Sequence, residues 1–163
     1  LDTRNDYETR VGTFDGAIGL DIPSFREFPD AIESLPDEYR SKTVVMYCTG
    51  GIRCEKLSGF LLKEGFKNVA QLDGGIVSYG QDPEVQGRDF EGQCYVFDSR
   101  IGVPVNGTNP TVVASCQICG KSSERYVNCA WKPCNCRIFL CFSCEKEAGR
   151  FCSDECDRLA GGR

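Results

Sequence analysis

The stretch VVMYCTGGIRCEK, residues 44–56, places a thiol where an apolar strand ends and a helical pattern begins. Gly50 and Gly51 let the loop curl so that its backbone N–H groups point inward and form an anion-binding nest. The helix N-terminus adds partial positive charge and Arg53 adds a full charge, and both favour the thiolate, which is the nucleophilic form of cysteine. A buried cysteine is often only a small apolar residue, but the two glycines and the arginine favour a reactive thiol with a depressed pKa at Cys48.

A second cysteine, Cys54, follows Cys48 at the start of the predicted helix. Redox-active cysteines are often placed beside a partner, so Cys54 fits the role of a thiol that resolves a persulfide or sulfenate on Cys48. It fits equally well as a residue of the first helical turn that faces the strand. The sequence leaves both roles open.

The elements that must position this loop alternate between strand and helix patterns. Apolar, β-branched or extended stretches predict strands at residues 1–3, 15–20, 42–48, 67–75 and 92–100. Helices are predicted at 24–35, which Pro29 must interrupt or restart, and at 55–66, which Gly65 is placed to end. This alternation predicts an α/β fold with a parallel sheet flanked by helices.

We expect three segments along the chain. The α/β domain occupies residues 1–100, a linker rich in Gly, Pro and Asn occupies 101–113, and a small cysteine-rich appendage occupies 114–163. The appendage is too short and too polar to bury a hydrophobic core of its own, so we expect it to be stabilised by cross-links such as bound metal ions.

The chain contains twelve cysteines and no histidine, and all cysteines except Cys48, Cys54 and Cys94 lie between residues 116 and 156. Close cysteine pairs separated by loops are typical of structural zinc, which takes four tetrahedral ligands. We predict about two zinc ions, bound by Cys116, Cys119, Cys134, Cys136, Cys141, Cys144, Cys152 and Cys156, with Cys129 as a substitute ligand. A sequential pairing and a cross-braced one, which joins the first pair to the third, both fit the spacing. An iron–sulfur cluster held by thiolates is the alternative.

Charge and hydropathy limit the partners. Residues 1–98 carry ten Lys/Arg and eighteen Asp/Glu, a net charge of −8, whereas residues 99–163 carry a net charge of +3 that zinc-bound thiolates would largely cancel. Charge alone therefore does not support the binding of a polyanion. No apolar run approaches the length of a membrane span, and the metal-type spacing of the cysteines favours a reducing, cytoplasmic compartment. The cysteine-rich segment also contains five basic residues that either present a basic face to RNA or are ordinary solvated surface charges: Arg125, Lys132, Arg137, Arg150 and Arg158.

The loop CTGGIR resembles the active-site loop of rhodanese-like domains, whose first cysteine carries a persulfide. The stretches LDTRNDYE, GAIG and LDGGI resemble other landmarks of that family, in the expected order. Related dual-specificity phosphatases have one more residue between cysteine and arginine, so the shorter loop favours sulfur over phosphate. The resemblance implies that Cys48 and Arg53 are catalytic, with an active-site loop of Thr49, Gly50, Gly51 and Ile52. Asp2, Arg4 and Glu8 resemble the family's polar cluster at the strand ends, and we expect them to form buried ion pairs that shape the loop as its scaffold.

The whole set of motifs, together with FEGQCYVFDSR and the cysteine-rich tail, is similar to the tRNA uridine hydroxylase family. That similarity implies an oxygen-dependent conversion of wobble uridine to 5-hydroxyuridine, with tRNA as the partner. The sequence itself contains no iron-site, flavin or haem motif that would identify an oxygen-activating cofactor. Proteins of this family carry a further N-terminal domain, so we expect an upstream segment that supplies much of the RNA contact; a transit peptide there would direct the protein to an organelle.

Two other functions remain open. The same thiol suits a sulfurtransferase, which would take sulfur from a small donor such as thiosulfate or a persulfide. A module that binds a partner without chemistry is the third interpretation, and the intact thiol and loop count against it.

Overall fold

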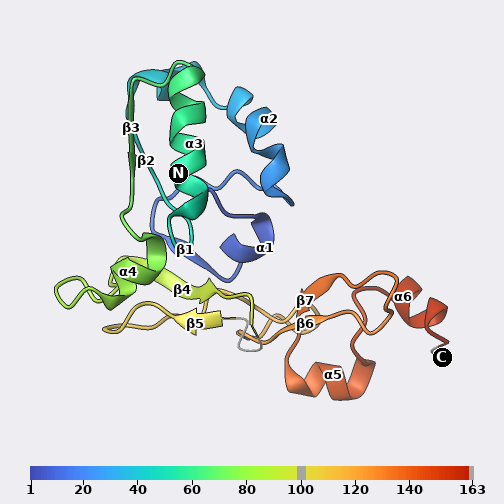
Figure 1. Ribbon diagram of the computed structural model, residues 1–163. Helices are drawn as coiled ribbons and strands as arrows, with labels where there is room; N and C mark the ends of the chain where they lie inside the picture. Colours follow the sequence, from blue (N-terminus) through green and yellow to red (C-terminus); the bar gives the residue numbers. More distant parts are fainter. Residues whose placement is uncertain (99–101, 162–163) are drawn as a thin grey trace. The chain divides into compact units, whose positions relative to one another are not determined.

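The computed structural model describes residues 1–98 and 102–161 and divides the chain into two compact units, Leu1–Thr111 and Val112–Arg163 (Figure 1). The helical elements of the first unit are α1 (Asp6–Thr9), η1 (Phe25–Glu27), α2 (Phe28–Glu33), η2 (Asp37–Ser41), α3 (Ile52–Lys63) and α4 (Gly75–Gln81). Its strands are β1 (Gly12–Phe14), β2 (Thr43–Met46), β3 (Asn68–Gln71), β4 (Phe90–Tyr95) and β5 (Gly102–Pro104). The α/β character expected from the sequence is therefore confirmed.

The pairing that positions the thiol loop is the parallel one between β2 and β3, with Thr43 opposite Asn68 and Met46 opposite Gln71. Isolated parallel bridges join Asp2 to both Tyr47 and Gly19, so the start of the chain lies beside the end of β2. The crossover between β2 and β3 is α3, as expected for parallel neighbours.

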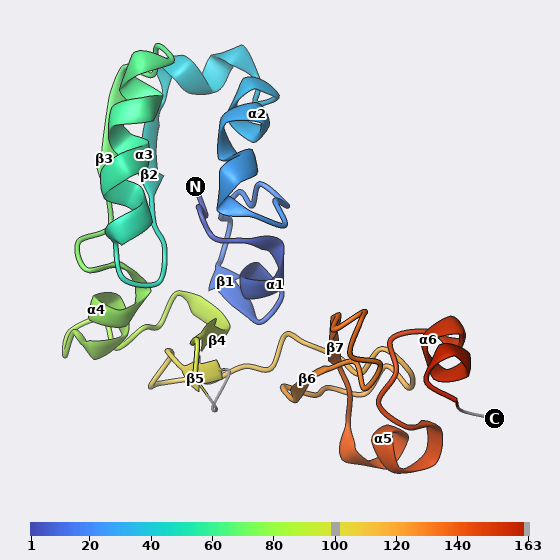
Figure 2. The same cartoon turned by 45° about the vertical axis from the view of Figure 1, so that its right-hand side comes forward.

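Helix α3 runs alongside β2 and β3 in both views of the chain (Figures 1 and 2). Its buried residues, Cys54, Leu57 and Leu61, recur at helical spacing and form one apolar face. That face shares a core cluster with Val44 and Met46 of β2, because alternate strand residues point to the same side of a sheet. Burial of this face fixes the helix N-terminus next to the end of β2.

The helical stretch expected at 24–35 is split at the predicted place. The short 3₁₀ helix η1 precedes α2, and Pro29 lies in the first turn of α2, where its missing N–H costs no hydrogen bond. Phe28 and Ile32 are fully buried in the same cluster as α3, and the rings of Phe28 and Phe60 lie edge to face at 6.2 Å.

The prediction of a strand at residues 15–20 is wrong. The regular strand is β1, earlier in the chain, and the expected stretch contributes only the bridge of Gly19 to Asp2. Gly16 has a φ of 69° and Ala17 donates its N–H to the carbonyl of Phe14, so the chain turns here instead of extending.

A second sheet, antiparallel and in the order β1-β4-β5, was not expected from the sequence. It contains the expected strand 92–100 up to Tyr95; residues 99–100 lie outside the described residues. It also changes the expected linker 101–113, because residues 102–104 form β5 and residues up to 111 belong to the first unit. The reason is packing: Val105 and Asn106 are buried, and the Asn106 amide donates to the carbonyl of Arg88.

The second unit is small. It contains β6 (Tyr126–Asn128), β7 (Arg137–Phe139), α5 (Phe142–Ala148) and α6 (Asp154–Leu159), with β6 and β7 paired antiparallel. Its core cluster consists of Ile138 and Leu140 together with Cys116 and Cys144. Ala114, Tyr126 and Phe139 are also buried, so the apolar core of this unit is small. Within residues 1–98 and 102–161, no helix is long and apolar enough to cross a membrane.

Candidate functional site

The sulfur of Cys48 lies at the bottom of the loop between β2 and α3. The residue is 2% exposed, and the backbone N–H of Gly51 donates to its sulfur at 3.1 Å. Gly51 has a φ of 84° and caps α3, so the loop closes around the sulfur immediately before the helix begins. This backbone conformation favours glycine, as the sequence predicted.

The first turn of α4 holds the same loop from the other side. The N–H groups of Ile76 and Val77 donate to the carbonyls of Cys48 and Thr49, at 3.0 Å and 3.1 Å. Gly75 has a φ of 64°, and a Cβ atom built there would lie 2.5 Å from the carbonyl oxygen of Cys48. The close approach of α4 to the loop therefore requires glycine. The sequence analysis included the LDGG stretch in the strand predicted at 67–75 and treated it as a family landmark; the strand ends at Gln71 instead.

The side chain of Arg53 forms an ion pair with Glu8. Its guanidinium makes two hydrogen bonds to the Glu8 carboxylate, at 2.6 Å and 2.7 Å, and Glu8 is fully buried on α1. The hydroxyl of Thr49 also donates to Glu8, at 3.4 Å. A bidentate pair of this kind fixes the orientation of both groups. Arg53 thus joins the loop to α1, and much of its positive charge is balanced by Glu8.

A second buried ion pair orders the start of the chain. The guanidinium of Arg4 donates to both carboxylate oxygens of Asp2, at 2.9 Å and 2.6 Å, and to the carbonyl of Gly12 at 2.6 Å. The hydroxyl of Tyr47 donates to Asp2 at 2.7 Å. Tyr47 directly precedes Cys48, so this network fixes the end of β2. Asp2, Arg4 and Glu8 thus lie in two ion pairs beside the loop; the sequence indicated buried ion pairs for these three residues but did not indicate that Arg53 is the partner of Glu8.

The hydrogen bonds around Cys48 lower the pKa of its thiol to about 5. The largest cause is a hydrogen bond from the thiol of Cys54; the backbone N–H groups of Arg53 and Cys54 and the charge of Arg53 act in the same direction, and burial opposes them. The same contact with Cys48, followed by burial, raises the pKa of Cys54. These shifts, together with the N–H of Gly51 directed at the sulfur, favour the thiolate form of Cys48.

Two loop residues expected in the site lie on the surface. Ile52 is 73% exposed, and Gly50 is exposed, with open space where a Cβ atom would be. Thr3, which no sequence signal singled out, is fully buried and places its hydroxyl 3.6 Å from the sulfur of Cys54. Cys94 is buried in the neighbouring core cluster, where burial raises its pKa.

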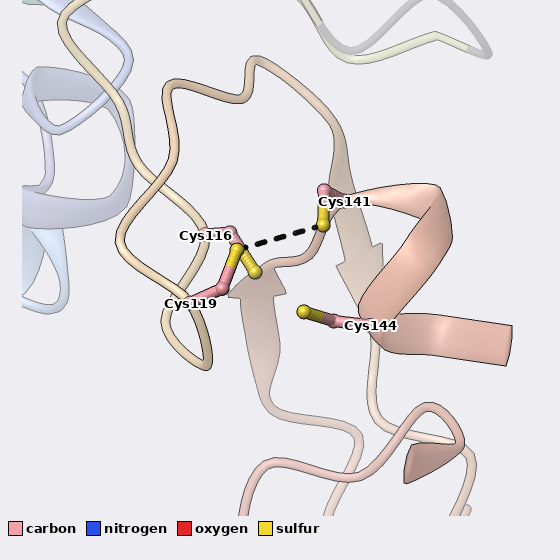
Figure 3. Close-up of side chains that lie close together, drawn as sticks. All are labelled: Cys116, Cys119, Cys141 and Cys144. Atoms are coloured by element: carbon pink, nitrogen blue, oxygen red, sulfur yellow. Dashed lines mark hydrogen bonds between the residues drawn. The ribbon is translucent and has the colours of Figure 1, made fainter. Parts of the chain in front are cut away.

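The cysteines of the second unit form two groups of four. In the first group, Cys116 and Cys119 come from one turn, and Cys141 and Cys144 from the start of α5 (Figure 3). Their sulfur atoms all lie within 4.8 Å of one another, and those of Cys119 and Cys141 are 3.8 Å apart. This is the cross-braced arrangement, in which the first pair meets the third.

The second group consists of Cys129, Cys134, Cys152 and Cys156, with sulfur atoms again within 4.8 Å of one another. It corrects the ligand set expected from the sequence, because Cys129 takes the place given there to Cys136. Cys129 is buried, whereas Cys136 is exposed and its sulfur contacts the carbonyl of Arg137 at 3.7 Å. The β6–β7 hairpin decides which of the two sulfurs faces the group.

Both groups could hold a metal ion. Four thiolates around one ion with metal–sulfur bonds of about 2.3 Å place their sulfurs about 3.8 Å apart, which matches the 3.8 Å between Cys119 and Cys141. In the second group the corresponding sulfur distances are 3.5 Å for Cys134–Cys152 and 3.4 Å for Cys152–Cys156. All twelve cysteines of the chain are free of disulfides.

Comparison with known proteins agrees with this architecture. Residues 1–82 match the family described as Rhodanese-like domain, and residues 91–157 match the family described as Rhodanase C-terminal. The chain is 54% identical over 156 residues to proteins named tRNA uridine(34) hydroxylase from Shouchella clausii (strain KSM-K16), Streptococcus pyogenes serotype M12 (strain MGAS2096) and Streptococcus agalactiae serotype III (strain NEM316). These alignments cover 96% of this chain and 48% of each relative, so the chain spans about half the length of the curated relatives it matches.

The first unit, with its thiol loop between a strand and a helix, is a rhodanese-like domain. The region that follows, with its two cysteine groups, is a rhodanese-type C-terminal region. The chain therefore belongs to the rhodanese-like domain family, and along 96% of its length it is similar to proteins named tRNA uridine(34) hydroxylase.

The depressed pKa of Cys48 predicts how its alkylation by iodoacetamide depends on pH. Only the thiolate reacts, so the rate should rise as the pH passes through about 5 and level off above it. Trypsin cleaves after Lys42 and Arg53, so residues 43–53 form a peptide that contains Cys48 and no other cysteine. Mass spectrometry of that peptide measures the rate. A midpoint near the free-cysteine value of about 8.5 would contradict the prediction.

The Gly75→Ala variant should disturb the loop. Its Cβ would lie 2.5 Å from the Cys48 carbonyl at a positive φ, so we expect the free energy of unfolding of the first unit to fall by about 1–3 kcal/mol. The Cys48 alkylation midpoint should rise, because the loop N–H groups shift. Gly59→Ala is the control: no atom lies within 4 Å of its Cβ, and alanine favours a helix interior by up to about 1 kcal/mol. Urea unfolding that is equal for the two variants would refute this role of Gly75.

Proposed function

We propose that this protein modifies tRNA by oxygen-dependent hydroxylation of the wobble uridine to 5-hydroxyuridine, and that the reaction requires the Cys48 thiolate. The observation that carries the proposal is the combination of a complete thiol loop with 54% identity to proteins named tRNA uridine(34) hydroxylase. A chain that had kept only the scaffold for binding would have no need for a buried sulfur held as an anion.

Each residue of the site has a part in this proposal. Cys48 supplies a nucleophilic sulfur, and the N–H of Gly51 stabilises its negative charge. The Arg53–Glu8 pair holds the loop in the conformation that encloses the sulfur. Residues 1–98 carry a net charge of −8, so we propose that most of the contacts that bind the tRNA backbone come from outside this stretch.

The test of the function measures tRNA nucleosides in cells. Cells that lack the gene for this protein should have no 5-hydroxyuridine at the wobble position, and a copy of the natural gene should restore it. The Cys48→Ser copy should restore less than about a hundredth, because a serine hydroxyl remains protonated at neutral pH. A Cys94→Ser copy is the matched control, a buried thiol in the core beside the site, and should restore most of the modification.

Unchanged 5-hydroxyuridine in cells without the gene would refute the proposed function. Full restoration by the Cys48→Ser copy would leave the function in place but would remove Cys48 from the mechanism.

A second candidate is sulfur transfer, which the depressed pKa of Cys48 also favours. The thiolate would attack the sulfane sulfur of thiosulfate, release sulfite and become a persulfide, which then passes its outer sulfur to an acceptor. Treatment of the protein with thiosulfate distinguishes the two candidates. A mass increase of one sulfur atom on the peptide of residues 43–53, with no effect of gene loss on 5-hydroxyuridine, would favour sulfur transfer.

We further propose that the two cysteine groups hold one structural zinc ion each. All four positions of each group are filled by protein thiolates, which is the closed arrangement of structural zinc sites. Zinc is favoured over an iron–sulfur cluster because the four sulfurs of each group are spaced for a single tetrahedral ion. In this proposal the metal-binding free energy supplies much of the folding free energy of the second unit.

Elemental analysis should find about two zinc ions per chain. The Cys129→Ser variant should lose about one of them, whereas Cys136→Ser should keep both, because only Cys129 belongs to a group of four. Trp131 is the single tryptophan of the chain and lies in the second unit, so its fluorescence reports unfolding of that unit when a chelator is added. The Cys48 alkylation midpoint should stay unchanged under chelation. Iron in the purified protein, or equal zinc loss in both variants, would overturn the assignment.

A further inference from the structure

The carboxylate of Glu8 is fixed by hydrogen bonds on both of its oxygens. The residue is fully buried on α1. One oxygen accepts from Arg53 at 2.6 Å and from the backbone N–H of Asn5 at 3.1 Å. The other oxygen accepts from Arg53 at 2.7 Å and from the hydroxyl of Thr49 at 3.4 Å. Because any other position of the carboxylate would break these hydrogen bonds inside the protein, Glu8 stays paired with Arg53.

The contact with Thr49 shows where the guanidinium of Arg53 lies. Thr49 directly follows Cys48, and its hydroxyl binds the same carboxylate oxygen of Glu8 as Arg53 does. The guanidinium therefore lies beside the loop that carries the sulfur. A free guanidinium in this place would suit a bound anion, which it can hold with two parallel hydrogen bonds. In this protein both terminal nitrogens of Arg53 already bind the carboxylate of Glu8.

We propose that Glu8 is a specificity-determining residue, which keeps Arg53 from binding anionic substrates and so favours a neutral group, such as a nucleobase, at Cys48. Arg4, the other arginine beside the loop, is paired with Asp2 in a similar way. The net charge of −8 on residues 1–98 also disfavours a dianion such as thiosulfate or phosphate. The nucleobase as the neutral group rests on the proposed hydroxylation, whereas the exclusion of anions rests on the ion pair alone.

The test uses two alkylating reagents of similar size and different charge, neutral iodoacetamide and anionic iodoacetate. Both react with the Cys48 thiolate, so the ratio of their rates cancels any change in the thiolate fraction and reports the charge that a reagent meets at the sulfur. Mass spectrometry of the tryptic peptide 43–53 gives both rates at neutral pH. Where Arg53 is replaced, the peptide extends to Lys56, and its fragment ions locate the label on Cys48.

We expect the ratio of the iodoacetate rate to the iodoacetamide rate to rise about tenfold in Glu8→Gln, because the charge of Arg53 is then unbalanced. The double variant Glu8→Gln/Arg53→Gln, in which both partners are neutral, should return to the ratio of the unaltered protein. Asp6→Asn is the matched control, since it removes one negative charge from the same helix, where the partner is Arg10 with a side chain that is 59% exposed. It should change the ratio by less than about twofold.

An unchanged ratio in Glu8→Gln would overturn the proposal, as would an equal rise in Asp6→Asn or a raised ratio that persists in the double variant. Because loss of a buried partner can unfold a protein, the unaltered protein is also compared with a small neutral thiol, β-mercaptoethanol. Its Cys48 should show a ratio no higher than that of this thiol, and a higher ratio would overturn the proposal without any variant. These measurements use no tRNA, so their failure is distinct from failure of the proposed hydroxylation, which is read from 5-hydroxyuridine in cells.

Discussion

The negative charge on a buried sulfur is the constraint on which the first unit depends. An isolated ion costs several kcal/mol to bury, so the Cys48 thiolate is stable only where donors surround it. The loop provides the N–H of Gly51, at 3.1 Å, and the backbone N–H groups of the first turn of α3. Two glycine positions make this geometry attainable: Gly51, with its positive φ, and Gly75, which lets α4 approach the loop carbonyls.

The arginine of the loop serves a different purpose from a free positive charge. Because Arg53 is bound by two hydrogen bonds to Glu8, the pair is close to neutral and connects α1 to the loop. The Asp2–Arg4 pair does the same for the end of β2 through Tyr47. Replacing buried pairs by apolar residues often costs little stability, so their value here lies in the fixed orientation of the groups around Cys48. The thiolate is then stabilised mainly by hydrogen bonds, with a smaller contribution from net charge.

The second unit combines a small apolar core with two groups of four cysteines. Its apolar core around Ile138 and Leu140 is small, and domains of this size often need disulfides or metal ions to be stable. Cross-bracing joins segments that are distant in sequence, so that each group connects a turn or hairpin to a later helix, α5 or α6.

The sequence by itself determined the local features. The β-branched run before Cys48, the apolar spacing of Leu57 and Leu61, the break at Pro29 and the cysteine pairs each identify an element or a chemistry, because these signals depend on neighbouring residues only. The tertiary structure alone decided which distant groups meet. Glu8 and Arg53 are 45 residues apart, β1 and β5 are short strands that form only beside β4, and Cys129 instead of Cys136 faces its group of four because of how the hairpin folds. Cys54 shows the same limit: its type and position were visible in the sequence, but only the fold places the Thr3 hydroxyl 3.6 Å from its sulfur.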